Sequence, residues 1–294
     1  MKDFKDKVAV ITGAASGIGR GVAERCAQEG MKVVLADVEK KSLTQTGKEI
    51  KSSGARVLTV LTDVSKASDV EALAQKTLDT FGAVHLLFNN AGVSMGTVIW
   101  ESTVKDWEWV LGVNLWGAIH GIRVFVPIML EQDTECHIVN TASMAALISY
   151  PTRGIYTVTK HGVLALTEKL YHELVWHGAK IKVSILLPGS VKTRIWDAER
   201  NRPAELRNAP AEEKELSPEY QVINQMGRLA VDAGESPQHV ADCVFKAIRE
   251  EKFYIITHPE MKPLVQMRMD DIMQERNPTN PFAEQMATIG KPKK

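Results

Sequence analysis

Apolar residues along the chain follow two patterns that alternate from one end to the other. Short continuous apolar runs are typical of buried β-strands, and they occur at 7–12, 32–36, 56–61, 84–88, 135–141, 180–187 and 253–257. Apolar residues spaced for one helix face are typical of helices that cover a sheet, and they occur at 18–29, 40–53, 67–81, 104–131, 154–177 and 237–250. This alternation predicts an α/β fold, a doubly wound parallel sheet of about seven strands with helices on both faces.

Length alone suggests one or two domains, and the alternation of strand and helix patterns favours one domain followed by an extension. The chain has 294 residues, of which 44% are hydrophobic, and this is enough for a large core. We expect a single domain over 1–258. Within it, the polar, Pro-interrupted segment 193–236 predicts a helical lid over a substrate, with a surface excursion as the alternative. A partial apolar stripe in the extension, 259–294, predicts a helix that covers a neighbouring subunit or the substrate mouth, or one that packs ordinarily on the domain.

A glycine-rich turn follows the first predicted strand, where Lys7 to Ile11 runs into Thr12-Gly13-Ala14-Ala15-Ser16-Gly17-Ile18-Gly19. A strand that breaks into such a turn and then a helix aims backbone N–H groups at a pyrophosphate. Gly13 can make the tight turn, Gly17 lets the backbone approach phosphate oxygens, and Gly19 lets the helix pack against the strand. The spacing departs from the G-x-G-x-x-G fingerprint, and a purely structural turn is the alternative.

An acidic residue, Asp37, ends the second predicted strand. At that place a carboxylate can accept hydrogen bonds from the ribose hydroxyls of the adenosine, and it would repel a 2′-phosphate. The sequence therefore favours NAD over NADP, although Arg20, Lys40 and Lys41 lie close enough in sequence to weaken the repulsion. A turn or cap residue is the alternative role for Asp37.

A tyrosine and a lysine share one predicted helix, at Tyr156 and Lys160, and Ser143 lies upstream. Their spacing places the phenol and the ammonium on one helix face, where the cation lowers the pKa of the phenol. A tyrosine that acts as a base near neutral pH needs its pKa lowered by about three units from about 10. Lys160 and a positive nicotinamide ring are the two cations that could supply that shift. Taken alone, such a pair occurs by chance in many amphipathic helices.

Together these motifs resemble those of the short-chain dehydrogenase/reductase family. The resemblance runs from about Phe4 to His258, and the glycine spacing is the one that this family uses. The motifs stand in the family's order at Thr12 to Gly19, Asp37, Asp63-Val64, Asn89 to Gly92, Asn114, Ser143, Tyr156 to Lys160, and Pro188-Gly189 with Thr193.

The resemblance implies a catalytic tetrad of Asn114, Ser143, Tyr156 and Lys160. In that family's chemistry Ser143 would hold the substrate hydroxyl, Tyr156 would remove its proton, and Lys160 would also bind the nicotinamide ribose. The main chain at Asn114 would hold a water that completes a proton path.

The resemblance also implies a dinucleotide site. Asp63 would contact the adenine amino group, and the segment from Pro188 to Thr193 would hold the nicotinamide carboxamide. The expected cofactor-binding residues are Gly13, Ser16, Gly17, Ile18, Gly19, Asp37, Asp63, Val64, Asn90, Ala91, Gly92, Tyr156, Lys160, Pro188, Gly189, Val191 and Thr193.

Three of these positions have structural alternatives. Asp63 could be a helix N-cap, although Ser65 and Ser68 are available for that position. Asn89 and Asn90 could be turn residues, because asparagine tolerates left-handed backbone. Asn114 lies in an apolar run, where it could be a core amide with all its hydrogen bonds satisfied.

The expected substrate pocket is apolar. Met144 to Tyr150 and Val93 to Met95 would form its wall, and Ile195 and Trp196 would begin the lid. This lining favours a bulky, hydrophobic secondary alcohol or its ketone over a small polar acid. The expected substrate residues are Ser143, Met144, Met95, Tyr150, Tyr156 and Trp196.

Charge and cysteine usage argue against several other classes of protein. Basic and acidic residues balance at 36 each, so no broad footprint for nucleic acid is expected. Three scattered cysteines without C-x-x-C spacing argue against a disulfide framework or a zinc site, and His161 and His172 lack the pattern of a metal site.

The charged N-terminus has no signal-like apolar region, and the apolar segment 122–130 is too short to span a bilayer. We expect a cytoplasmic protein without a metal ion or membrane partner.

Two other functions remain open. A lyase, epimerase or isomerase could use the same tyrosine and bound NAD without net redox change, and a sensor could bind NAD(H) without catalysis. The resembled family commonly forms tetramers through two long helices, here 104–131 and 154–177, so a homotetramer or homodimer is expected.

Overall fold

Seven parallel strands form one sheet at the centre of the protein, in the order β3-β2-β1-β4-β5-β6-β7. The structure, a computed structural model, describes residues 1–209 and 217–283 of the chain. The strands are β1 (Val8–Thr12), β2 (Lys32–Asp37), β3 (Val57–Leu61), β4 (Leu86–Asn89), β5 (Cys136–Thr141), β6 (Ile181–Leu187) and β7 (Tyr254–Ile256). The predicted fold class is confirmed, and each of these strands lies at a predicted apolar run.

The order of the strands reverses at β1. Val10 pairs with Val34 of β2 on one side and with Leu87 of β4 on the other. The connections that leave the carboxyl ends of β1 and β4 therefore diverge to opposite sides of the sheet. In a doubly wound sheet ligands bind in the crevice that this divergence opens.

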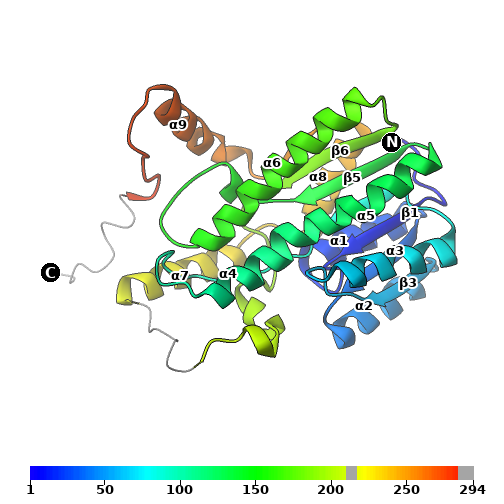
Figure 1. The fold of residues 1–294 in the computed structure, drawn as a ribbon, viewed down its shortest axis with the longest axis horizontal. Coiled ribbons are helices and arrows are strands. Elements are labelled where there is room, and N and C mark those ends of the chain that lie inside the picture. The colour runs from blue at the N-terminus through cyan, green and yellow to red at the C-terminus, as the bar shows by residue number, and fades with distance from the viewer. Residues whose placement is uncertain (210–216, 284–294) are drawn as a thin grey trace.

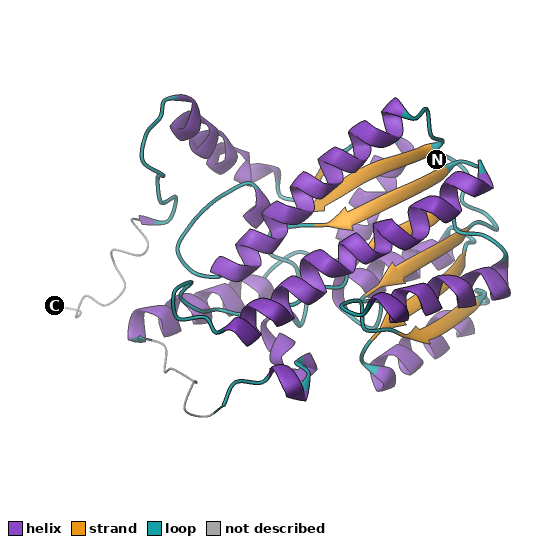
Figure 2. Cartoon of the chain, viewed as in Figure 1, coloured by secondary structure: helices purple, strands orange, loops and turns teal. Residues whose placement is uncertain are grey.

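Helices cover both faces of the sheet (Figures 1 and 2). The helices of one face are α1 (Gly17–Gln28), α2 (Lys40–Ser52) and α8 (Pro237–Arg249), and those of the other are α3 (Ala67–Phe81), α5 (Gly117–Gln132) and α6 (Gly154–Trp176). Successive strand residues point to opposite faces, so Ile11 packs in the core under α1 and α8, while Val10 packs in the core under α3, α5 and α6. Both cores are apolar, which is why the strands read as continuous apolar runs.

The predicted helix 104–131 is interrupted in the structure. It consists of α4 (Val104–Leu111), a π-helical segment (Gly112–Trp116) and α5. Thr103 and Asp106 form a capping box at its start. The combined stretch Val104–Gln132 is the one helix of the described ranges that is long and apolar enough to cross a membrane. Its Phe125 and Met129 are buried in the core against the sheet, as in a covering helix of a soluble fold.

Several short elements lie beyond the carboxyl ends of the strands. They are η3 (Ile195–Asn201), η4 (Ala204–Leu206), α7 (Pro218–Asp232), η5 (Pro259–Met261) and α9 (Lys262–Met273). The expected lid, 193–236, contains η3, η4 and α7, and its residues 210–216 lie outside the described residues. The expected extension contains α9, which projects from one end of the molecule in Figure 1, and its residues 284–294 also lie outside the described residues.

Candidate active site

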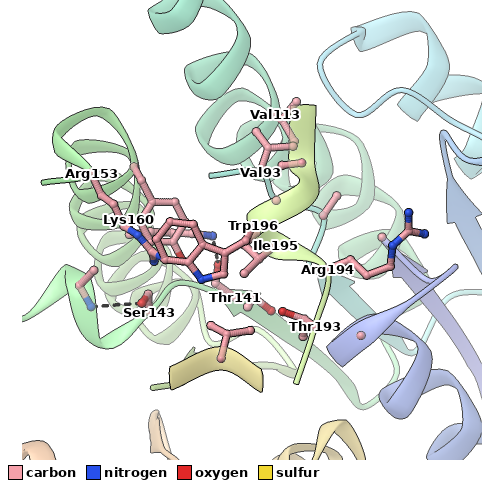
Figure 3. Close-up of a pocket in the computed structure, with 18 of the residues that line it drawn as sticks. Val93, Val113, Thr141, Ser143, Arg153, Lys160, Thr193, Arg194, Ile195 and Trp196 are labelled. Carbon is pink, nitrogen blue, oxygen red and sulfur yellow. Dashed lines mark hydrogen bonds between the residues drawn. The ribbon is translucent and has the colours of Figure 1, made fainter. Parts of the chain in front are cut away.

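A cavity of about 680 Å³ lies where the strand order reverses. The glycine turn after β1, the ends of β2 and β4, and Ser143 after β5 line it together with Tyr156 and Lys160 of α6. Segments 188–191 and 193–196 and helix α7 complete its lining, part of which is drawn in Figure 3. The cavity therefore joins segments that the sequence analysis assigned separately to a cofactor and to a substrate.

The glycine turn is shaped by close backbone contacts. Gly13 has a φ of +66°, which favours glycine. A Cβ atom at Gly19 would lie 2.1 Å from the Gly13 carbonyl oxygen, a distance that no side chain tolerates. Ser16 is extended and precedes the first residue of α1 without a side-chain cap. The helix N-terminus thus faces the cavity, and its backbone N–H groups can donate hydrogen bonds to a phosphate.

Two carboxylates lie along the wall beyond the glycine turn. Asp37 accepts hydrogen bonds from the backbone N–H groups of Ala15 and Glu39, each at 2.9 Å. Burial raises the pKa of the Asp37 carboxyl, and these N–H groups oppose that rise. Asp63 accepts hydrogen bonds from the N–H and hydroxyl of Ser65. Neither Asp63 nor a serine caps α3, because its N-cap residue is Lys66.

Asn89 and Asn90 differ in their surroundings. Asn89 is buried and donates to Asn140 Oδ1 at 2.8 Å. Asn90 lines the cavity and donates to the carbonyl of Thr12 at 3.0 Å, while Thr12 Oγ1 accepts from the N–H groups of Asn90 and Ala91. Asn89 therefore has a structural position, and Asn90 ties the glycine turn to the end of β4.

Asn114 lies in the π-helical segment and is fully hydrogen-bonded. Its Oδ1 accepts from the N–H of Val93 at 2.8 Å, and its Nδ2 donates to Val93 O and Thr159 Oγ1, both at 3.0 Å. The side chain therefore fastens the loop after β4 to α6 and does not line the cavity. Any direct part in the chemistry is left to its main chain.

Ser143, Tyr156 and Lys160 come together on one wall of the cavity. Tyr156 is 9% exposed and Lys160 is 3% exposed. The Lys160 ammonium lies 5.5 Å from the centre of the Tyr156 ring and donates to the carbonyl of Thr141 at 2.9 Å. Ser143 is extended and comes directly before the short helix Met144–Ala146, where its hydroxyl accepts from Ala145 N.

The electrostatics of Tyr156 differ from the expectation. Burial raises the pKa of the phenol, and a hydrogen bond with Ser143 and the charge of Arg153 lower it only in part. Burial also lowers the pKa of Lys160 to about 8, because a desolvated ammonium is unfavourable. The protein alone therefore does not lower the phenol's pKa through Lys160 as expected. A positive nicotinamide ring is the other cation that could lower the pKa of the phenol.

The segment after β6 is positioned by a histidine that the sequence analysis missed. His258 Nδ1 accepts from the N–H of Gly189 at 3.1 Å, and its Nε2 lies 3.1 Å from the carbonyl of Ser190. A Cβ at Gly189 would lie 2.6 Å from the imidazole. No motif signals this contact, because His258 and Gly189 are 69 positions apart.

The segment expected to form a lid is held by two ionic clusters. Glu39 binds Arg200 at 2.6 Å and Arg194 at 3.5 Å. Arg202 binds Asp106 at 2.6 Å, with both side chains at most 4% exposed. Burial alone would raise the pKa of Asp106, but the Thr103 N–H and Arg202 hold it below its usual value. Neither cluster was expected from the sequence.

Most of the expected site residues line the cavity. Gly19 and Asn114 lie behind its wall, and Met95 packs beside the apolar cluster of Trp109 and Ile155 instead. The residues of the expected site that do line it are Gly13, Ser16, Gly17, Ile18, Asp37, Asp63, Val64, Asn90, Ala91, Gly92, Ser143, Met144, Tyr150, Tyr156, Lys160, Pro188, Gly189, Val191, Thr193 and Trp196. Within the described ranges, no three His, Cys, Asp or Glu side chains are grouped as a metal site would require.

These residues fit a dinucleotide. A Cβ at Gly13 would lie 2.9 Å from Ala91 Cα, and one at Gly19 would lie 2.1 Å from the Gly13 carbonyl oxygen, so the turn before α1 requires glycine at both positions. The Asp37 carboxylate lines the same cavity. The same cavity continues to Lys160 and to the 188–193 segment. Phosphate, ribose and nicotinamide groups thus each meet the type of residue that binds them.

Comparisons with known proteins agree with this geometry. The model of a family described as short chain dehydrogenase matches residues 7–204. The CLA biosynthesis dehydrogenase/reductase of Lactiplantibacillus plantarum is 36% identical over 278 residues, which cover 95% of this chain and 97% of that protein. The diacetyl reductase [(S)-acetoin forming] of Staphylococcus epidermidis is 37% identical over 191 residues, 65% of this chain and 74% of that protein.

A solved structure is more similar still. The crystal structure of a short chain dehydrogenase/reductase from Burkholderia phymatum in complex with NAD has a TM-score of 0.92 and 49% sequence identity. The match covers 96% of this chain and 99% of that chain.

Proposed function

Because the chain belongs to the short-chain dehydrogenase family, we propose that it is an NAD-dependent enzyme that interconverts a bulky, hydrophobic secondary alcohol and its ketone. One observation carries this proposal. The phenol of Tyr156 is buried on the wall of the cavity that begins at the glycine turn, with Ser143 and Lys160 beside it. A sensor that only binds a dinucleotide has no need for this group of three.

The side chains divide the work of proton transfer. Ser143 holds the hydroxyl of the alcohol, and Tyr156 removes its proton as general base. Lys160, fixed to the Thr141 carbonyl, would bind the nicotinamide ribose, and the positive nicotinamide ring would favour the phenolate. Bound NAD supplies the hydride acceptor. Asn114 keeps the loop after β4 and α6 in register, and its main chain holds a water on the path to solvent.

Asp37 supports the preference for NAD. Its carboxylate already accepts two backbone hydrogen bonds at the end of β2, so it is held in place on the cavity wall. A 2′-phosphate there would face that negative charge. Arg20, a cation that could weaken this repulsion, is paired with Glu24 and Glu49 instead. The Burkholderia phymatum protein, solved with NAD, supports the same choice.

The substrate end of the cavity is apolar. Met144, Ile148, Tyr150 and Trp196 line it together with α7. Such a lining binds a bulky hydrophobic body through loss of its apolar surface from water. Segment 193–236 then serves as the lid that closes over the substrate.

Assembly and location are further parts of the proposal. Trp116, Val175 and Trp176 are large apolar residues that are more than half exposed at the helices expected to form the subunit contact. We infer a homotetramer or homodimer through 104–131 and 154–177, and sedimentation as a monomer at micromolar concentration would reject it.

All three cysteines are free, which supports a reducing, cytoplasmic location.

A panel of aromatic, steroid and aliphatic secondary alcohols, tested with NAD⁺ and with NADP⁺, examines this function. Stoichiometric NADH formation, faster with NAD⁺ than with NADP⁺, is the expected result. Isomerised or cleaved product without NADH would indicate the lyase or epimerase instead. NADH binding without any conversion would indicate the sensor.

A further inference from the structure

Arg153 is delivered into the cavity by an unusual backbone. It comes directly before α6, three residues ahead of Tyr156, and both Thr152 and Arg153 have left-handed backbone, with φ values of 83° and 54°. Such conformations cost free energy for residues other than glycine, and they persist where the surrounding structure requires them. Here they place the guanidinium carbon 3.7 Å from the centre of the Trp196 ring and 5.9 Å from that of Tyr156.

The Arg153 guanidinium has no acidic partner. Over residues 1–209 and 217–283 it makes contacts with the rings of Trp196 and Tyr156 and no ion pair or hydrogen bond. The two other arginines that line the cavity, Arg194 and Arg200, both bind Glu39. Burial lowers the pKa of Arg153, as expected for a cation that is partly removed from water without a counter-ion.

A second donor at the same place is also unpaired. The indole Nε1 of Trp196 is buried, and in the described part of the chain it meets no hydrogen-bond acceptor. In Figure 3, Arg153, Lys160, Ser143 and Trp196 are grouped on one side of the cavity, and Thr193 and Arg194 lie on the other. A cation and an N–H group that share one apolar region without an acceptor are suited to an anionic ligand.

The rest of this region is apolar and wide. Met144, Ile148, Met226, Val231, Met261 and Phe282 line it. A single guanidinium balances the single charge of a carboxylate and matches its two oxygens with a planar fork. A phosphate dianion would leave one charge uncompensated among these side chains. The chemistry therefore favours a carboxylate on an otherwise hydrophobic molecule.

We propose that the substrate is a hydroxy acid or keto acid with a hydrophobic tail, whose carboxylate binds the Arg153 guanidinium and the Trp196 N–H. This inference rests on the proposed dehydrogenase function and specifies its substrate class. The Arg153 guanidinium carbon lies 5.9 Å from the centre of the Tyr156 ring, so the carboxylate lies only a few covalent bonds from the carbinol carbon. The carboxylate is bound and remains chemically unchanged, while Met226, Val231 and Phe282 line the space for the tail.

The activity test compares two molecules that differ only in charge, 3-hydroxyoctanoate and 3-hydroxyoctanamide, with NAD⁺. The wild-type protein is expected to favour the acid in kcat/KM by about 10- to 100-fold, the range of a charge-assisted contact. Arg153→Met, which keeps an unbranched apolar side chain and removes the charged fork, should bring this acid-to-amide ratio close to 1. Arg153→Lys should leave an intermediate ratio, because the charge remains and the fork is lost.

Arg228→Met is the matched control. Arg228 also lies over the Trp196 ring, at 5.9 Å, but it is exposed and paired with Asp197, so the acid-to-amide ratio should be kept. Equal use of acid and amide by the wild-type protein, or a ratio that Arg153→Met leaves intact, would overturn the proposal.

A binding test separates this inference from the proposed function. Calorimetric titration of the wild-type protein with octanoate, which has no hydroxyl to oxidise, should give affinity about 10-fold or more above that for octanamide, and Arg153→Met should remove the difference. If neither hydroxy compound yields NADH, the dehydrogenase function fails for this class while octanoate binding still decides on the anion site. Equal binding of octanoate and octanamide would reject that site.

Discussion

The two ends of the cavity are built by different means. At the dinucleotide end, the glycine turn is joined to the end of β2 by backbone contacts, such as the hydrogen bond from Ala14 N to the carbonyl of Ala36. At the substrate end, η3 and η4 are held by side-chain charges from distant elements, such as Arg202 to Asp106, which are 96 positions apart. The first end is set by backbone shape, and the second by a few ion pairs.

The two ends therefore differ in how readily cofactor binding and substrate choice can change. Backbone contacts at the glycine turn leave little freedom for side-chain variation, since even a methyl group at Gly19 collides with the Gly13 carbonyl. Ion pairs such as Glu39 to Arg200 can be exchanged without altering the sheet. Cofactor binding is therefore the rigid property of this fold, and substrate choice is the adjustable one.

The largest effect is expected where the two ends meet, at the reacting group. Tyr156→Phe should lower kcat by about 10²- to 10⁴-fold, the usual contribution of a general base, and NADH affinity should stay close to that of the wild type. Turnover followed by NADH absorbance and binding followed by NADH fluorescence measure the two quantities. Tyr254→Phe is the control, because Tyr254 is half exposed, donates its hydroxyl to Glu168 and does not line the cavity. An active Tyr156→Phe protein would remove Tyr156 from the mechanism.

A second substitution tests whether ion pairs hold the substrate end. Arg202→Met leaves the Asp106 carboxylate buried without its cation, which should cost about 3–5 kcal/mol of unfolding free energy. KM for the alcohol should rise more than KM for NAD⁺. Urea unfolding and steady-state kinetics measure these changes. Arg123→Met, which breaks an exposed pair with Glu71, should cost at most about 1 kcal/mol. Equal costs for the two variants would contradict the contrast.

A third substitution tests whether the backbone of the glycine turn shapes the dinucleotide end. Gly19→Ala forces the turn to shift by overpacking, at a cost of about 1–3 kcal/mol, and we expect this cost to appear mainly as about 10-fold weaker NADH binding. Fluorescence titration with NADH is the measurement. Gly82→Ala provides the comparison, because its φ of +77° strains a side chain while no atom lies within 4 Å. That variant should lose stability and keep its NADH affinity. Unchanged NADH binding in Gly19→Ala would show that the turn is not shaped for phosphate.

The smallest effect concerns the pH dependence of alcohol oxidation. Burial raises the pKa of Tyr156, so kcat/KM for a neutral alcohol at saturating NAD⁺ should rise as the pH increases toward that pKa. The Arg153 charge lowers the phenol's pKa. Its removal in Arg153→Met makes phenolate less favourable and should move the rising limb to higher pH. Arg228→Met should leave the limb in place, and a shift to lower pH in Arg153→Met would contradict the assigned sign.

Local spacing in the chain was enough to predict the sheet, its covering helices and the dinucleotide end. Apolar runs marked the strands because both faces of the sheet are buried. Tyr156 and Lys160 share a helix face because four residues make about one turn. The turn from Thr12 to Gly19 was predictable since its shape depends on residues within a few positions of one another.

Tertiary structure decided the rest of the site. It brought Ser143 to Tyr156, paired Arg202 with Asp106 and set His258 against Gly189, contacts between residues far apart in sequence. It also gave Asn114 a hydrogen-bonded place in a π-helical segment. Among the described residues, it left Arg153 facing the cavity without an acidic partner. The spacing of apolar residues does not predict such contacts, because they depend on how the helical connections between strands place distant segments against one another. Sequence spacing therefore specified the elements and the cofactor turn, while packing determined the partners of each charge and so the substrate end.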